Sequence, residues 1–105
     1  MAWFYLFIAG LLEVVWAYFM KQSLGFSRLT PSLITLVTMV ASFWLLSLAM
    51  RTLPLSTAYV MWTGIGAVGA FLVGVFVLSE AISPLKIIAA LLIISGLILM
   101  KVATK

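Results

Sequence analysis

Four long apolar runs, separated by short polar stretches, dominate the order of side chains along the chain. A charged residue closes each run: Lys21, Arg51, Glu80 and Lys101 in turn. A helix of roughly 17–25 residues crosses about 30 Å of hydrocarbon, and each run has about that length. Because lipid offers backbone groups no other partner, we expect membrane-spanning helices at about residues 3–20, 31–50, 55–78 and 84–100.

The three prolines support these boundaries, because none of them interrupts a run. Thr30–Pro31 and Ser83–Pro84 each combine a hydroxyl suited to the N-cap with a proline suited to the first helical position. Pro54 precedes the third run. The connecting stretches are too short for a soluble domain, so we expect residues 1–105 to form one all-α membrane unit.

The composition supports the membrane assignment and excludes several kinds of functional site. Of 105 residues, 67% are hydrophobic and 8% are charged, which a soluble domain of this size could not bury. The apolar character continues to the C-terminus, so we expect the first run to belong to the mature protein. Cysteine and histidine are absent, which excludes disulfides, thiol nucleophiles and imidazole bases, and we expect no metal and no cofactor.

Basic residues number six against two acidic ones, and they stand singly at the ends of the runs. This placement favours membrane flanks over a nucleic-acid surface. With four spans, the basic residues divide equally between the two sides of the membrane. One side has Arg51, Lys101 and Lys105, and the other has Lys21, Arg28 and Lys86. Either a feature outside this tally selects one orientation, or the chain inserts both ways and forms an antiparallel dimer.

Glu13 is the residue that the sequence most strongly indicates to be functional. It lies ten residues after Trp3, about 15 Å along a helix and near the middle of the hydrocarbon. A charge there costs at least ~2.5–3.5 kcal/mol on insertion scales, and no basic residue lies in the interior of a run to pair with it. One interpretation is a permanently protonated side chain. The other is a carboxylate that holds either a proton or a cation, which is sufficient to couple the two flows.

The residues on the same helical face as Glu13 suit a small cation. Gly10 lies three residues before it and Trp16 three residues after it. In the third run, Tyr59, Trp62 and Thr63 share a helical stripe. Aromatic faces attract cations, most strongly when water is excluded. We therefore predict a cation pocket that these residues line together with Glu13.

Small and polar residues add two further predictions. Glycines at 64, 66 and 69 indicate close helix packing and a flexible point that alternating access could use, and Gly96, with Ala90 and Ser95, indicates a helix–helix contact in the fourth run. Ser42 lies in the middle of the second run. Its hydroxyl either binds a ligand in the pocket or bonds the carbonyl four residues earlier.

Several segments of the chain resemble the small multidrug resistance family. They are residues 10–17 (GLLEVVWA), 25–32 (GFSRLTPS) and 57–67 (TAYVMWTGIGA). Trp16 and the string from Trp62 to Ala67 are similar to the guanidinium-exporter branch. The resemblance implies an antiparallel, dual-topology homodimer in the plasma (inner) membrane that exchanges protons for guanidinium by alternating access.

By the same resemblance, Glu13 is the shared proton and substrate carboxylate, and Gly10 is a close-packed position beside it. The positions that line the binding site in that branch are Trp16, Ser42, Tyr59 and Trp62. Two features differ from the branch. Ser56 and Val60 replace a glycine and an alanine, and the segment with Phe43 and Trp44 is closer to the drug-exporting branch.

The leading hypothesis is therefore a proton-coupled antiporter of guanidinium and small substituted guanidinium ions. The first alternative is a proton-coupled exporter of quaternary ammonium or other hydrophobic cations. A second is an uncoupled channel or a structural membrane subunit. An enzyme is not expected, because no nucleophile has a base beside it. Four helices are too few to enclose a wide polar path comfortably, so we expect an oligomer.

Overall fold

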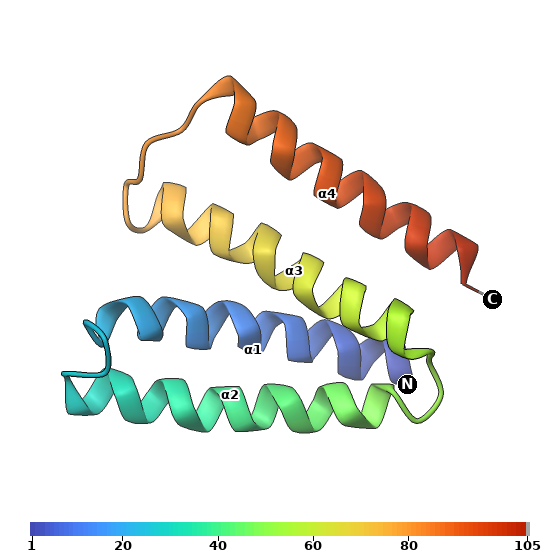
Figure 1. The fold of residues 1–105 in the computed structure, drawn as a ribbon, viewed down its shortest axis with the longest axis horizontal. Coiled ribbons are helices and arrows are strands. Elements are labelled where there is room, and N and C mark those ends of the chain that lie inside the picture. The colour runs from blue at the N-terminus through green and yellow to red at the C-terminus, as the bar shows by residue number, and fades with distance from the viewer. Residues whose placement is uncertain (105) are drawn as a thin grey trace.

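The computed structural model describes residues 1–104 and contains four long helices within them (Figure 1). They are α1 (Ala2–Gln22), α2 (Leu29–Ala49), α3 (Leu55–Phe76) and α4 (Pro84–Ala103). All four are long and apolar enough to cross a membrane, and no strand occurs in the described part of the chain. The predicted all-α membrane fold is confirmed.

The starts of two helices, α3 and α4, agree with the positions predicted from the prolines, and the start of α2 does not. At α4, Ser83 is the N-cap, its hydroxyl accepts a hydrogen bond from the Lys86 backbone N–H at 3.3 Å, and Pro84 follows as the first helical residue. Pro54 is the residue before α3. The prediction for Thr30–Pro31 is wrong, because α2 begins at Leu29 with no side-chain cap. Pro31 is tolerated in the first turn, where backbone N–H groups have no helical partner.

The two ends of the bundle differ in what they contain. The α1–α2 and α3–α4 connections lie at one end, called the loop end below, and the two termini and the α2–α3 connection lie at the other, the terminal end (Figure 1). This arrangement agrees with the two sides assigned above to Lys21, Arg28, Lys86, Arg51 and Lys101. Lys105 lies outside the described residues.

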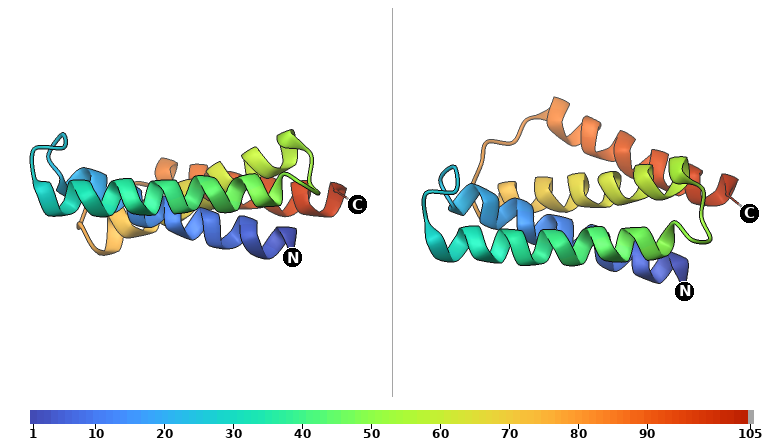
Figure 2. Two further views of the ribbon diagram at one scale, coloured as in Figure 1. Left: turned by 90° about the horizontal axis from the view of Figure 1, so that it is seen from below. Right: turned by 60° about the horizontal axis from the view of Figure 1, so that its bottom comes forward.

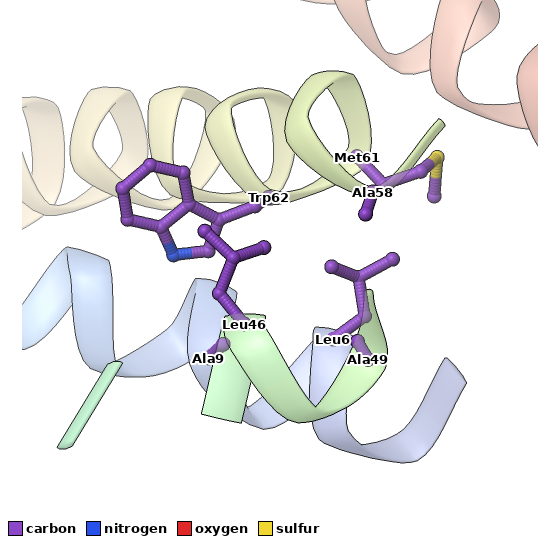
Figure 3. Close-up of a cluster of buried hydrophobic side chains, with 7 residues drawn as sticks. All are labelled: Leu6, Ala9, Leu46, Ala49, Ala58, Met61 and Trp62. Carbon is purple, nitrogen blue, oxygen red and sulfur yellow. The ribbon is translucent and has the colours of Figure 1, made fainter. Parts of the chain in front are cut away.

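Apart from Ser23 in the α1–α2 connection, the buried side chains belong to the first three helices. α1 packs against both α2 and α3, whereas α4 packs mainly against α3 (Figure 2). The central cluster joins α1, α2 and α3 through seven residues, drawn in Figure 3: Leu6, Ala9, Leu46, Ala49, Ala58, Met61 and Trp62. No described residue of α4 is buried.

Candidate functional site

Glu13 lies in the middle of α1 and faces α3. Its Oε1 atom is buried and has no hydrogen-bond partner within the chain. Gly66 of α3 makes the room for it, because a Cβ atom built on Gly66 would overlap the Glu13 carboxylate. The sequence places a glycine where α3 crosses the acid, and the two helices can therefore approach closely enough to exclude water from one carboxylate oxygen.

Two other glycines bring α1 and α3 together on either side of this point. A Cβ atom on Gly10 would overlap the side chain of Ile65, and one on Gly69 would overlap Val14. The predicted close-packed position beside Glu13 is therefore found at Gly10. Its contact is an aliphatic side chain of the facing helix.

Trp16 lies one helical turn after Glu13 and leaves a second polar group without a partner. Its indole Nε1–H is buried and makes no hydrogen bond within the chain. α1 thus carries an unpaired acceptor and an unpaired donor one turn apart. Unpaired buried polar groups are rare in native proteins and usually mark a functional site or a missing ligand.

Ser42 does not bond the carbonyl four residues earlier, which was one of the two expectations for it, and its part in ligand binding stays a prediction. Its hydroxyl donates to the Ala9 carbonyl of α1 at 2.7 Å, so the bond to the carbonyl four residues earlier is not formed. The same oxygen accepts a hydrogen bond from the Trp62 Nε1–H at 3.0 Å. Ser42 is fully buried. It connects all three packed helices and orients the Trp62 ring.

A series of aromatic rings extends from α1 across α2 to α3. The ring centroids of Trp16 and Phe43 are 6.4 Å apart, those of Phe43 and Trp62 are 5.6 Å apart, and those of Trp62 and Tyr59 are 5.8 Å apart. Such spacings are typical of attractive edge-on or tilted contacts. Phe43 was noted above only as part of a branch-like segment, and its position next to Ser42 gave no signal, because adjacent residues of a helix face different directions.

Two of the predicted site residues lie on another face of the bundle. Thr63 donates its hydroxyl hydrogen bond to the Tyr59 carbonyl at 2.9 Å and lines a groove between α3 and α4. Gly96 borders the same groove, but a Cβ atom on it would meet nothing within 4 Å. The predicted helix contact at Gly96 is therefore not formed within the chain. Gly64 is the residue that packs there, against Leu97.

The electrostatic setting of Glu13 follows from where the basic groups lie. The one ion pair in the described residues joins Lys21 Nζ and Glu80 Oε2 at 3.7 Å, at the loop end. No described basic side chain pairs with Glu13. Within residues 1–104 no group of three His, Cys, Asp or Glu residues could hold a metal ion. The arrangement can therefore offer a negative charge and aromatic faces to a proton or to an organic cation.

A family model described as Small Multidrug Resistance protein matches residues 1–94. The chain belongs to the small multidrug resistance family. Its similarity to other members extends over almost the whole chain. A protein named Guanidinium exporter from Citrobacter freundii is 54% identical and covers 99% of both chains. Proteins of the same name are 55% identical in Salmonella typhimurium, over 98% of both chains, and 56% identical in Yersinia pseudotuberculosis, over 99% of this chain and 100% of the relative.

Membership of the small multidrug resistance family confirms the resemblance described above and the four-helix membrane architecture. The chain is a multi-pass membrane protein of a transporter family. The site residues assigned from the sequence remain predictions. The structure brings Glu13 together with Gly66, Trp16 with Phe43, and Ser42 with Trp62, all on the three packed helices.

Proposed function

We propose that this protein is a proton-coupled antiporter that exports guanidinium, and small substituted guanidinium ions, across the plasma (inner) membrane. The observation that carries the proposal is the Glu13 carboxylate, which lies mid-span with one buried oxygen unpaired. Without an ionic partner among residues 1–104, this group gains stabilisation from a proton or from a cation. The two compete for the same oxygens, and that competition couples their opposite movements.

Guanidinium matches the groups around Glu13 in shape and in charge. It is planar and permanently charged, and it presents parallel N–H pairs that a carboxylate can accept two at a time. Its flat faces can stack on the rings of Trp16, Phe43 or Trp62, which lie in series. The name Guanidinium exporter, carried by relatives more than half identical to this chain, supports the same substrate.

The working form in this proposal is an antiparallel homodimer with two Glu13 residues around one pathway. Two features support it: α4 has no buried residue within the chain, and the basic residues are balanced between the two ends. A reporter fused to the C-terminus should be detected on both sides of the membrane. Detection on a single side would contradict dual insertion.

The second candidate substrate class is quaternary ammonium and other hydrophobic cations. Phe43 favours it, because its ring lies between Trp16 and Trp62 and makes the lining more apolar. Such cations have no N–H donors and depend on the rings and the charge alone. Competition between guanidinium and a tetra-alkylammonium ion in one uptake assay distinguishes the two classes. A strong preference for the ammonium ion would favour this candidate.

The decisive experiment measures guanidinium uptake into liposomes that contain the purified protein, with the interior acidic or at the external pH. We expect uphill uptake only with the proton gradient. In Glu13→Gln, which cannot exchange a proton, coupled uptake should fall to background while the protein remains folded on gel filtration. Glu13→Asp keeps a titratable group and serves as the matched control. Proton-driven uptake by the Gln variant, or equal uptake without a gradient, would refute the proposal.

A further inference from the structure

The ion pair at the loop end joins two elements that are far apart in the sequence. Lys21 belongs to the last turn of α1, and Glu80 lies in the connection that follows α3. Their Nζ and Oε2 atoms are 3.7 Å apart, and both side chains are about half exposed or more, at 64% and 49%. Glu80 is the only acidic residue of the chain besides Glu13.

The chain bends back to place Glu80 over the end of α3. The Glu80 backbone N–H donates to the Gly74 carbonyl at 2.9 Å, and Ser79 before it has a left-handed φ of 56°. A Cβ atom built on Gly74 would overlap the Glu80 carboxylate. The position of the acid therefore depends on a specific turn and on a glycine beneath it. It is held by more than the charge of Lys21.

A crevice lies between α1 and α3 below this pair. Its volume is about 130 Å³, and Ala17, Tyr18, Ala70 and Gly74 are among the residues that line it. Lys21 and Glu80 border it as well, and so does Val14, the residue next to Glu13. A single water needs about 10–15 Å³ of such volume, so the crevice is large enough to admit water. It occupies the space between the level of Glu13 and the loop end.

We propose that Lys21 and Glu80 form a gate at the loop end of this crevice, and that their separation connects Glu13 with the solution on that side. The inference rests on the proposed transport function. An exposed ion pair contributes little free energy, so a gate of this kind can open and close without a large barrier. When it opens, the freed Glu80 carboxylate attracts cations to the mouth of the crevice.

The test measures access to the crevice directly, through a cysteine at its wall. The chain contains no cysteine, so Ala70→Cys supplies the single thiol for a charged, water-soluble thiol reagent. Removing the pair with Glu80→Gln or Lys21→Gln should raise the labelling rate about two- to fivefold, the factor that an exposed pair contributes. The double exchange Lys21→Glu with Glu80→Lys should restore the slower rate.

Arg28→Gln is the matched control, because it removes a basic charge from the same end without breaking an ion pair. It should leave labelling of the Ala70→Cys thiol unchanged. Equal rates in all backgrounds would overturn the gate, and so would an equal increase in the Arg28 variant. This readout needs no substrate, so it stands even if guanidinium uptake by the wild-type protein fails.

A second experiment holds the gate closed by joining positions 21 and 80 covalently. In a Lys21→Cys, Glu80→Cys protein, a flexible, reductant-cleavable thiol cross-linker should reduce proton-driven guanidinium uptake several-fold, and reductant should restore it. The single-cysteine proteins treated with the same cross-linker are the controls. If the locked protein transports as fast as the reduced one, the gate inference is wrong while the proposed function stands.

Discussion

Two parts of this small protein are built in different ways. The α1–α3 unit, which consists of helices α1, α2 and α3, contains all seven residues of the buried cluster. It also contains a hydrogen-bonded connection from Ala9 through Ser42 to Trp62. α4 is as long and as apolar, yet none of its described residues is buried, and its Ser95 hydroxyl bonds its own helix at Leu91. The buried, unpaired Oε1 of Glu13 and the series of aromatic rings thus lie on the first three helices, whereas the surface of α4 is left open within the described residues.

The sharpest test of this contrast compares two glycines. Gly66→Ala would force the new methyl group against the Glu13 carboxylate. Overpacking of this kind costs roughly 1–3 kcal/mol. If all of it falls on the cation-bound state, guanidinium affinity should drop about 5- to 150-fold. Isothermal titration of the purified protein measures this loss.

Gly96→Ala is the partner variant, because nothing lies within 4 Å of its added methyl group in the chain. Its affinity for guanidinium should match the wild type. If the two alanine variants lose the same affinity, the division between the α1–α3 unit and α4 is wrong.

Two serines give the second comparison. Ser42→Ala leaves the Trp62 indole N–H and the Ala9 carbonyl without their partner. Hydrogen bonds between membrane helices contribute about 0.6 kcal/mol on average and up to about 1.7 kcal/mol. We expect a loss of stability in this range in detergent unfolding, and a lower cation affinity because Trp62 is no longer oriented.

Ser95→Ala removes a hydroxyl whose only bond, at 2.8 Å, is to the Leu91 carbonyl of its own helix. Detergent unfolding should show no measurable change for this variant. An Ser95→Ala protein less stable than Ser42→Ala would reverse the assignment of roles to the two regions.

The smallest expected effect concerns a place where the two regions touch. The Lys101 ammonium of α4 lies 4.8 Å from the centre of the Trp3 ring of α1. An exposed cation–π contact contributes about 0.5–1 kcal/mol. Lys101→Gln should lower the stability by this amount and leave guanidinium uptake intact. Lys101→Arg keeps the contact and should behave as the wild type; a transport defect in the Gln variant alone would assign Lys101 a functional role.

The helices and the unusual setting of Glu13 could be predicted because they depend on the contrast between water and hydrocarbon. Runs of apolar residues predict where a chain crosses a membrane. A carboxylate in such a run stands out because placing a charge in hydrocarbon costs free energy. Serine and proline at 83–84 also predicted a helix start, because N-cap chemistry is local. The start of α2 was misplaced by two residues, since proline fits throughout the first turn and does not identify its first position.

The directions in which side chains face could not be predicted in the same way. In water, an apolar stripe identifies the buried face of a helix, but lipid is as apolar as the protein interior, and every face of these helices looks alike. Thr63 was therefore assigned to the pocket from its spacing, whereas it borders the groove to α4. The bond from Ser42 to Ala9 and the Lys21–Glu80 pair join residues distant in sequence, and they depend on how the helices cross.

The way in which α4 is attached has a mechanical consequence. Its contacts to the other helices through Leu97, Met100 and Lys101 lie in its C-terminal half. Toward Pro84, a hollow of about 340 Å³ opens between α3 and α4. The part of α4 between Pro84 and Leu97 is about 20 Å long, at 1.5 Å per residue. A turn of about 10° about Leu97 would displace Pro84 by some 3–4 Å. Pro84 follows the connection that holds Glu80, whose Oε2 lies 3.7 Å from Lys21 Nζ.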